Sequence, residues 1–558
     1  MEKQEIMQLK QLLGRFCQSG TGVIDRSVCE KAIGNFAQNR GEEKFCRLAA
    51  SLLVALAKPE NALPGSLKRY ELLVRDGVTM FLSLLSVPRL QKALLDQALL
   101  KTDCPVAERC VNLAMHFPTL HKLGQIVARH HPGHSLLHGW LASLEDSGSK
   151  ASIGAVRNHV QREWDRLGHS GHLELGTTIL AEASVAAVLP FCWHQKAKNK
   201  QVDGVFKVLK PAVREMVEEE LQVIGRMAKH LESNKARYGL GLMRVSGLCS
   251  ELREALEKET DLVAEQKNLS EAAKLYRSLD RVSVPELTAF RSSAMTGMQR
   301  IRGRKITEVR LSPGERLHLA CRLFTALVCV PLFSHEESSL FHGDPHAGNL
   351  LVVEDDKVGP IVVVIDWTLV GRLGRPLRIN IAAMMLAAAT GEVADLSRSI
   401  SAMTRLAKSP VSPGEIKHIV ASFFRSEKFC ADPLQKSFRL LERLTFEGIL
   451  FPGDLILFRK ALFTLEGVLI DFCPSFSMEQ AMKTYLGEVL IEEMPRRITN
   501  MFVPLLEKRS EYRSLLTNEE VARLSLSSSL GYQDELAAYG RWLQKTQMQF
   551  VASILPFF

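Results

Sequence analysis

The chain has 558 residues, of which 46% are hydrophobic and 24% charged, a composition typical of a globular protein with two to four domains. Its formal net charge is +9, but acidic and basic residues are interspersed and no long basic run occurs, so nucleic acid is excluded as the favoured partner. The mildly basic balance is compatible with weak association with an anionic lipid surface.

The cysteines and the apolar stretches indicate the cellular compartment. The 11 cysteines are scattered without a CxxC pair, which predicts reduced thiols. The first residues lack the basic and apolar regions of a secretory signal. The longest apolar stretch, Leu317–Phe333, is interrupted by His318, Arg322 and Pro331, so we expect a buried helix rather than a membrane span. We therefore expect a cytoplasmic protein without a signal peptide or transmembrane helix, and peripheral contact with a membrane remains an open alternative.

The first part of the chain, residues 1 to about 110, is predicted to be a helical bundle. Apolar residues recur at helical spacing in Ile6–Phe16 and again in Phe45–Leu56. No catalytic residue pattern stands out in this region.

Two short polar patterns follow the bundle. The tetrapeptide Lys122–Gln125 would by itself be only an exposed turn of helix. Four histidines then suggest a metal site, but Pro132 and Gly133 place them in a turn without an acid or cysteine, which favours a solvated or capping role. These histidines are His130, His131, His134 and His138.

A linker at Asp146–Lys150 and an amphipathic helix at 156–167 precede the first predicted strands, at 180–189 and 204–209. In the second strand, Lys207 lies among Val, Phe and Leu residues, where an unpaired buried ammonium group would be unfavourable. Two explanations stay open: Lys207 binds ATP phosphates and a helix glutamate, or it reaches solvent from an edge strand.

Candidate partners for Lys207 lie on a charged helix expected over 257–269. Asp261 and Glu265 are four residues apart and share a face, whereas Glu259 lies off that face. A further strand is expected at 282–285. The order of lysine strand, acidic helix, further strand and polar loop is the order in which a kinase-like fold arranges its parts.

The most informative stretch is Phe341–Asn349, followed by the apolar strand Val362–Ile365 and Asp366. A loop carboxylate such as Asp344, then an Asn and an Asp that hold magnesium, are the groups that kinase-type phosphoryl transfer uses. Strands at 350–353 and 361–365 are predicted to form a hairpin, which would bring Asn349 and Asp366 to one end. After Asp366 the chain is predicted to be helical, at 379–389, 440–444, 455–469 and 478–490.

Together these patterns resemble the UbiB/AarF family of atypical kinase-like proteins, over roughly residues 115–375. Lys122–Gln125 matches the family's KxGQ motif, and Ala181–Ala187 resembles its alanine-rich nucleotide loop. Glu259–Asp261 with Glu265 matches the ExD motif and the helix glutamate that follows it. His342–Asn349 and Asp366 match the catalytic loop and the metal aspartate.

The resemblance implies an α+β, bilobal protein-kinase-like fold with a small β-rich N-lobe, a helical C-lobe and an added N-terminal helical region. We expect the N-terminal helical region at 1–110, the KxGQ extension at 111–168, the N-lobe at 169–310 and the C-lobe with a helical extension at 311–558.

The resemblance also implies the functional residues, with ATP and Mg²⁺ as cofactors. Asp344 and Lys207 would be catalytic: Lys207 contacts the phosphates and is held by Glu265, and Asp344 orients or deprotonates the nucleophile. Asn349 and Asp366 would bind Mg²⁺.

The remaining implied residues surround the nucleotide. The ATP-binding loop would consist of Ala181, Ala183, Ser184, Val185 and Ala186. The KxGQ and ExD elements would contribute Lys122, Gln125, Glu259 and Asp261, with Lys122 near Glu259 or Asp261.

Two positions depart from the family pattern. Trp367-Thr368 follows Asp366 where the family usually has Phe-Gly, and a β-branched residue does not tolerate positive φ without strain. We therefore predict one fixed conformation at Asp366. In the alanine-rich loop, Glu182 and Ala187 replace Ala and Gln, and an acid near phosphates is unfavourable unless it points away or meets a metal.

The implied function is an ATPase or small-molecule kinase that supports isoprenoid-quinone metabolism, with a nucleotide and a lipid or isoprenoid compound as partners. One alternative is a phosphotransferase of the aminoglycoside or choline kinase type, which shares the His-Gly-Asp-x-x-x-x-Asn loop but lacks the KxGQ segment and the alanine loop. The other is a nucleotide-binding pseudokinase scaffold without turnover, which the Trp367-Thr368 change favours.

Overall fold

The computed structural model describes the chain with gaps. The described residues are 2–17, 26–63, 65–101, 104–123, 152–195, 200–240, 245–355, 358–407, 409, 411–426, 433–502, 512, 514–518 and 521. They form two compact units, Met1–Gln266 with Leu287–Arg300, and Lys267–Glu286 with Ile301–Phe558.

Unit 1 begins with the predicted helical bundle, which is confirmed. The helix α3 is its centre, because its buried face of Phe45, Leu48, Leu52 and Leu53 packs against the helices around it. The elements are α1 (Glu2–Cys17), α2 (Arg26–Arg40), α3 (Glu42–Ala57), η1 (Pro59–Ala62), η2 (Gly65–Tyr70), α4 (Glu71–Ser83), α5 (Val87–Ala98) and α6 (Val106–Ala114).

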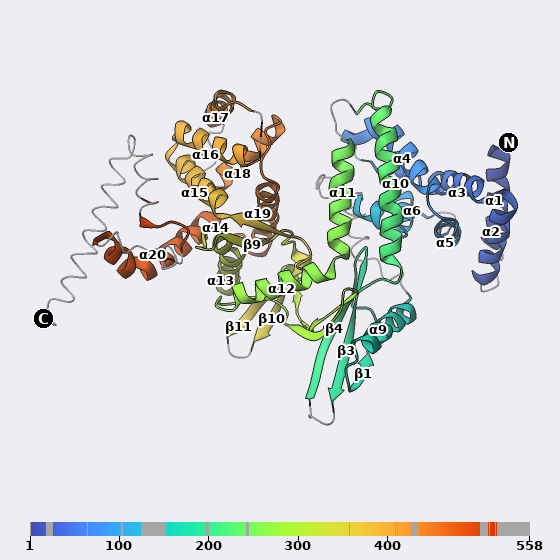
Figure 1. Ribbon diagram of the computed structural model, residues 1–558, viewed down its shortest axis with the longest axis horizontal. Helices are drawn as coiled ribbons and strands as arrows, with labels where there is room; N and C mark the ends of the chain where they lie inside the picture. Colours follow the sequence, from blue (N-terminus) through green and yellow to red (C-terminus); the bar gives the residue numbers. More distant parts are fainter. Residues whose placement is uncertain are drawn as a thin grey trace. The chain divides into compact units, whose positions relative to one another are not determined.

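A buried ion pair fixes this bundle to α10 (Val213–Ser233), which lies beside α11 (Val245–Thr260) (Figure 1). Arg89 on α5 pairs with Glu219 at 3.3 Å and with the fully buried Glu220. Glu220 also accepts a hydrogen bond of 2.8 Å from the backbone N–H of Thr119. The same carboxylate therefore holds the bundle and the segment that leads to Lys122.

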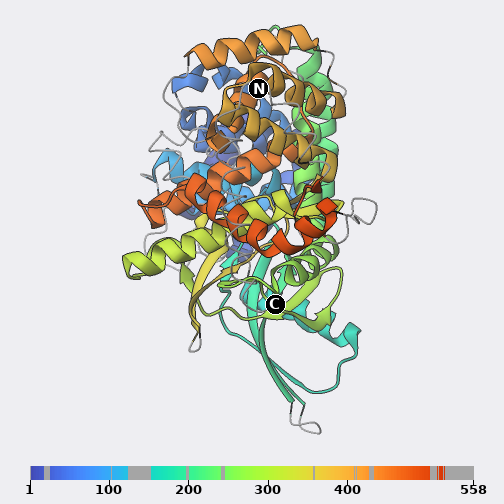
Figure 2. The same cartoon turned by 90° about the vertical axis from the view of Figure 1, so that its left-hand side faces the viewer.

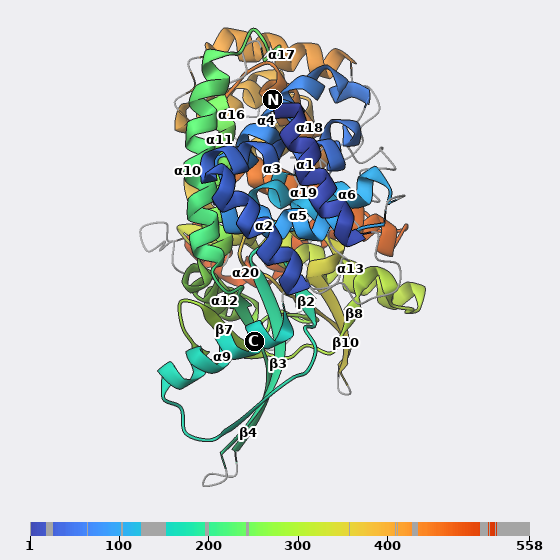
Figure 3. The same cartoon turned by 90° about the vertical axis from the view of Figure 1, so that its right-hand side faces the viewer.

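The sheet of unit 1 has the order β1-β3-β4-β7-β6, with β2 paired to β3. Its core is formed by Phe191, Phe206 and Phe290 of the sheet with Trp164 of α9 (Ile153–Leu167), which lies along the sheet (Figure 3). The strands are β1 (His172–Leu175), β2 (Ala181–Glu182), β3 (Ala186–Gln195), β4 (Lys200–Leu209), β6 (Leu287–Arg291) and β7 (Met295–Gln299).

The strand β4, which carries Lys207, pairs with β3 on one side and β7 on the other. The alternative in which Lys207 reaches solvent from an edge strand is therefore wrong. Phe206 and Val208 on the opposite face are fully buried, as the alternation of side chains along a strand predicts.

Unit 2 contains two small sheets and the predicted series of helices. One sheet has the order β5-β11-β10-β8, and the other pairs β12 with β9. The hairpin of β10 and β11, yellow in Figure 2, is confirmed. The strands are β5 (Val282–Ser283), β8 (Arg304–Lys305), β9 (Ser338–His342), β10 (Leu350–Asp355), β11 (Gly359–Val364) and β12 (Val370–Gly374).

The helices of unit 2 cover the positions expected from the sequence. They are η4 (Ile306–Glu308), α13 (Pro313–Phe324), η5 (Thr325–Cys329), α14 (Val330–Phe333), η6 (Ala347–Asn349), α15 (Arg375–Thr390), α16 (Val393–Leu406), α17 (Pro413–Ser426), α18 (Pro433–Phe446), α19 (Gly453–Phe472) and α20 (Met478–Phe502). The helix α12 (Leu262–Tyr276) contains the boundary between the two units.

One helical stretch of the described residues, Pro313–Phe333, is long and apolar enough to cross a membrane by length and composition. However, 61% of its apolar window is buried inside the protein, as expected for a core helix. A π-turn at Thr325–Cys329 immediately precedes Val330 and Pro331. Since Pro331 cannot donate to the helix ladder, the wider turn accommodates the interruption.

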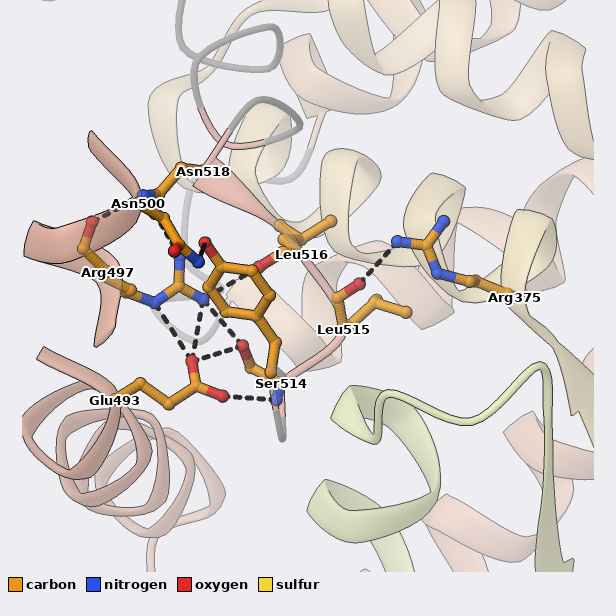
Figure 4. Close-up of polar contacts among 9 residues, drawn as sticks. Arg375, Glu493, Arg497, Asn500, Ser514, Leu515, Leu516 and Asn518 are labelled. Atoms are coloured by element: carbon orange, nitrogen blue, oxygen red, sulfur yellow. Dashed lines mark hydrogen bonds and ion pairs between the residues drawn. The ribbon is translucent and has the colours of Figure 1, made fainter. Parts of the chain in front are cut away.

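Within unit 2, the segment 514–518 is held against α20 by a buried ion pair (Figure 4). Glu493 and Arg497 of α20 pair at 2.9 Å, and both bind Ser514, whose N–H donates to Glu493 at 2.7 Å. At its other side, Leu515 accepts a hydrogen bond of 2.9 Å from Arg375 at the start of α15. Ser514 also forms an antiparallel bridge with Ser334, shortly before β9.

Replacing Arg497 by Met is expected to release this segment, because the Glu493 carboxylate, only 4% exposed, would stay buried without its cation. The expected cost is about 3 kcal/mol, measured as lost hydrogen-exchange protection of the Ser514 amide. Arg443→Met is the matched control, since Arg443 pairs with Glu447 at the same i,i+4 spacing on an exposed surface. Equal effects of the two substitutions would contradict the assignment.

Candidate active site

The loop His342–Asn349, which the sequence predicts to be catalytic and which is called the catalytic loop below, leaves β9 at His342. Two side chains hold the backbone of Asp344 from both ends. The Nδ1 atom of His342 accepts a hydrogen bond of 3.2 Å from the N–H of Asp344. The Nδ2 atom of Asn349 donates to the carbonyl oxygen of Asp344 at 3.0 Å. The direction of the Asp344 side chain is thus set by its neighbours in the loop.

His342 also holds the second aspartate. Its Nε2 atom lies 2.9 Å from the carbonyl oxygen of Asp366 and 3.3 Å from that of Ile365. Burial lowers the pKa of His342, although the nearby charges of Asp366 and Asp344 oppose this. A neutral ring that donates from Nε2 and accepts at Nδ1 satisfies all these contacts. The buried imidazole therefore couples the positions of Asp344 and Asp366.

The β10–β11 hairpin brings Asn349 and Asp366 to one end, as predicted. Leu350 pairs with Val364, and the N–H of Ile365 donates to the carbonyl oxygen of Asn349 at 2.9 Å. Asn349 is buried, whereas the Asp366 side chain is exposed. Oxygen donors of these two types are the ligands that Mg²⁺ takes from proteins, usually with phosphate and water completing the octahedron.

The positive φ occurs at Asp366 itself, at 58°. Thr368 does not have a positive φ, so the strain expected at Thr368 is not observed. Asp tolerates the left-handed region better than β-branched residues do, because its short side chain can bond locally. Here Oδ1 of Asp366 accepts hydrogen bonds from the Thr368 hydroxyl at 2.6 Å and from the Thr368 N–H at 3.3 Å.

Trp367 fixes the peptide on the other side of Asp366. It is 1% exposed, and its indole Nε1 donates to the carbonyl oxygen of Val364 at 3.1 Å. Its ring meets His342 edge to face at 4.9 Å, and Asn268 donates to its carbonyl oxygen at 3.2 Å. These contacts favour the predicted single conformation at Asp366, which stays a prediction.

In unit 1, Lys207 pairs with Glu265 at 2.6 Å, and both side chains are largely buried, with 13% and 4% exposed. The partner of Lys207 among the three candidate acids is therefore Glu265. The prediction of one continuous helix over 257–269 is wrong, because α11 ends before Asp261 and α12 begins after it. Asp261 instead caps α12 by accepting a hydrogen bond of 3.0 Å from the N–H of Ala264.

The alanine-rich loop forms the tight turn between β2 and β3. Ala181 lies in β2 and Ala186 in β3, while the N–H of Ala183 donates to the carbonyl oxygen of Ala186 at 2.8 Å. The carbonyl oxygen of Val185 accepts a hydrogen bond of 2.9 Å from the N–H of Lys210. The loop is therefore tied to the end of the strand that carries Lys207.

Glu259 connects this loop to the KxGQ segment. Its two carboxylate oxygens accept hydrogen bonds from the Ser184 hydroxyl, at 2.6 Å, and from the Lys122 ammonium group. Of the two acids proposed for Lys122, the structure therefore places Glu259 against it. Gln125 and the four histidines at 130–138 lie outside the described residues.

The charge of Glu182 is balanced within the protein, because its carboxylate pairs with the Lys210 ammonium group at 2.5 Å. Burial lowers the pKa of Lys210, and Glu182 opposes this shift. Nearby, burial lowers the pKa of His121 to about 4, so this imidazole is neutral at pH 7. The sequence did not single out Lys210 or His121. The pairing of β2, β3 and β4 sets Lys210 beside Glu182, and no local pattern shows this.

Comparisons with known proteins bear on the class of the domain. Residues 143–400 match the family model of the ABC1 atypical kinase-like domain. "Probable protein kinase UbiB" of Xanthomonas campestris pv. campestris (strain 8004) is 25% identical over 338 residues, which are 58% of this chain and 58% of that protein. The same-named protein of Shewanella baltica (strain OS185) is 22% identical over 467 residues, 78% of this chain and 80% of that protein. The chain thus spans little more than half the length of the Xanthomonas relative.

Among solved structures, Rv3197 from Mycobacterium tuberculosis in complex with erythromycin is similar to this chain. It is 18% identical, with a TM-score of 0.40, and the match covers 63% of this chain and 95% of Rv3197.

The chain therefore contains an ABC1 atypical kinase-like domain, and the predicted α+β, bilobal kinase-like fold is confirmed. Within that class, the matched family model and the relatives named UbiB support a place in the UbiB/AarF family. Within the described residues, no group of three or more His, Cys, Asp and Glu side chains forms a metal site. The Asn349 and Asp366 pair is compatible with a metal that also binds phosphate.

Replacing Thr368 by Val is expected to weaken Mg²⁺ binding, because it removes the hydroxyl that orients Asp366 and leaves the shape of the side chain. The Mg²⁺ concentration for half-maximal ATP binding should rise about tenfold, as measured by titration calorimetry. Thr368→Ser keeps the hydroxyl and is expected to behave like the native protein. If the Val and Ser variants bind Mg²⁺ alike, the hydroxyl has no such role.

Replacing Glu182 by Ala, the residue usual in the family, is expected to destabilise unit 1, because the largely buried Lys210 loses its partner. The loss should be about 3 kcal/mol, and Lys210→Met in the same chain should recover part of it. Thermal unfolding of both single variants and the double variant measures the coupling. If the losses of stability in the two single variants add up in the double variant, the pairing of Glu182 with Lys210 is contradicted.

Proposed function

We propose that this chain is an ATP-binding atypical kinase-like enzyme that transfers the γ-phosphoryl group of ATP, with Mg²⁺, to water or to a small-molecule hydroxyl group. The observation that carries the proposal is His342, whose neutral ring holds the backbones of Asp344 and Asp366 together. A carboxylate that handles the proton and a carboxylate that binds the metal must keep a fixed separation for this reaction.

Each proposed residue has a defined task. Lys207 binds the phosphates and is held by Glu265. Asn349 and Asp366 hold Mg²⁺, which, when bound, neutralises charge on the phosphates. Asp344 accepts the proton of the attacking hydroxyl group. The turn that contains Ser184 and Val185 is fixed by Glu259 and Lys210, which supports a rigid nucleotide loop.

The resemblance to the UbiB/AarF family supports a proposed substrate class. The acceptor would be a lipid precursor or another isoprenoid compound of quinone metabolism, and the protein would make peripheral contact with a membrane. The paired Lys122 and Glu259 favour this assignment over an aminoglycoside or choline kinase type, because those enzymes lack the KxGQ segment.

A pseudokinase scaffold is the second candidate. The buried Trp367 and the Thr368 hydroxyl restrain Asp366 on both sides. A rigid Asp366 that binds MgATP without turnover would produce the same contacts. Turnover therefore has to be measured.

Replacing Asp366 by Asn is expected to lower the release of phosphate from ATP by on the order of 10²-fold, because one charged metal ligand is lost. Purified full chain with Mg²⁺ and ATP is assayed for inorganic phosphate. Asp280→Asn is the control, since Asp280 is exposed and lies outside the proposed site. If Asp366→Asn binds MgATP and the native protein releases phosphate no faster than this variant, the pseudokinase scaffold is the correct function.

A further inference from the structure

The helix α19 forms the support of the catalytic loop. A Cβ atom on Gly343 would lie 3.2 Å from Leu457 of this helix, so the loop backbone rests directly on it. Phe458 meets Phe341 edge to face at 5.1 Å. Asp454 accepts a hydrogen bond of 3.2 Å from the N–H of Arg372 in β12. The helix is thus fixed to both strands of the β9–β12 pair, the first of which leads into the loop.

One charged side chain of α19 reaches the catalytic aspartate. The Nζ atom of Lys460 lies 3.7 Å from Oδ1 of Asp344, and the two side chains are 43% and 17% exposed. This is an ion-pair distance that exceeds a normal hydrogen bond. So exposed a pair contributes at most about 1 kcal/mol to stability, so the loss of Lys460 is expected to leave the fold intact.

The neighbouring Arg459 shows the contrast. Its guanidinium group pairs with Glu442 of α18 at 3.0 Å and lies over the ring of Phe463. Arg459 therefore joins two helices, whereas Lys460 on the same turn directs its charge at the catalytic loop.

The catalytic loop itself supplies no lysine or arginine between Asp344 and Asn349. The histidine in this stretch, His346, accepts a hydrogen bond of 3.1 Å at its Nδ1 atom from the N–H of Gly348. Phosphoryl transfer spreads negative charge over the equatorial oxygens of the transferred group, and a positioned cation stabilises that charge. Among the described residues, Lys460 is a cation that the structure pairs with Asp344.

We propose that Lys460 is a further catalytic residue: it holds the Asp344 carboxylate before the reaction and binds the transferred phosphoryl group in the transition state. This inference rests on the proposed function. In the step, a bond forms between the hydroxyl oxygen of water or of an acceptor alcohol and the γ-phosphorus. The bond from the γ-phosphorus to the bridging oxygen breaks, ADP leaves with the electron pair, and the hydroxyl proton passes to Asp344.

The experiment compares the binding of MgADP with that of MgADP plus aluminium fluoride, which imitates the transferred phosphoryl group. The full chain, Lys460→Met, Lys460→Arg and Lys483→Met are titrated by calorimetry. Lys483 is the control because it forms an exposed ion pair with Glu479 on α20. Phosphate release from ATP is measured on the same four proteins.

We expect Lys460→Met to weaken the fluoroaluminate complex by about tenfold or more, to leave MgADP binding within twofold, and to lower turnover in proportion. Lys460→Arg should recover part of both losses, since it keeps the charge. Lys483→Met should match the native protein.

Two results would overturn the inference, and they are distinguishable. If the native protein binds the fluoroaluminate complex no more tightly than MgADP, phosphoryl transfer is the wrong function and the role of Lys460 falls with it. If the native protein binds the fluoroaluminate complex more tightly than MgADP, and Lys460→Met shows the same preference, the proposed function stands and Lys460 has no part in it. A loss of MgADP binding as large as the loss of the fluoroaluminate complex would likewise contradict a role in the transition state.

Discussion

The candidate site depends on one buried imidazole. His342 is 2% exposed, and its two nitrogens are committed to the backbones of Asp344 and Asp366. Because a buried ring without partners would be unfavourable, the ring requires both segments to be in place. The imidazole binds the main chains of the two aspartates, so it fixes their positions without using their carboxylates. Trp367 packs edge to face on the ring and adds a third constraint.

Anchors at both ends of the β9–β12 ribbon support this imidazole. Near the loop, α19 lies under Gly343 and Phe341. At the far end, the segment 514–518 bridges to Ser334 and binds Arg375. The ion pair of Glu493 and Arg497 that holds this segment is therefore connected to the catalytic loop by a continuous strand pair. The described segment 514–518 thus supports the far end of the strand pair that leads to the loop.

Local sequence patterns predicted the parts of the site that lie within single elements. The apolar runs on either side of the turn near Asp355 predicted the β10–β11 hairpin, and the hairpin alone determines that Asn349 and Asp366 share an end. The apolar setting of Lys207 predicted a buried partner, because only pairing makes such a lysine tolerable. Glu265 is that partner.

Other features arise from tertiary contacts that no local pattern encodes. The helix ends at Asp261 because its side chain caps the next helix, which periodicity alone does not show. Glu182 is accommodated because β3 pairs with β4 in the register that sets Lys210 beside it, and Lys460 lies far downstream of Asp344 in the sequence. The positive φ at Asp366 depends on Thr368, whose hydroxyl compensates for the strain.

The most direct measurement is a crystal structure of the full chain with Mg²⁺ and a non-hydrolysable ATP analogue. The account predicts one nucleotide whose phosphates lie within hydrogen-bonding distance of the Lys207 ammonium group, with Mg²⁺ bound by Asn349 and Asp366. A nucleotide bound elsewhere, or a metal held without Asp366, would contradict it.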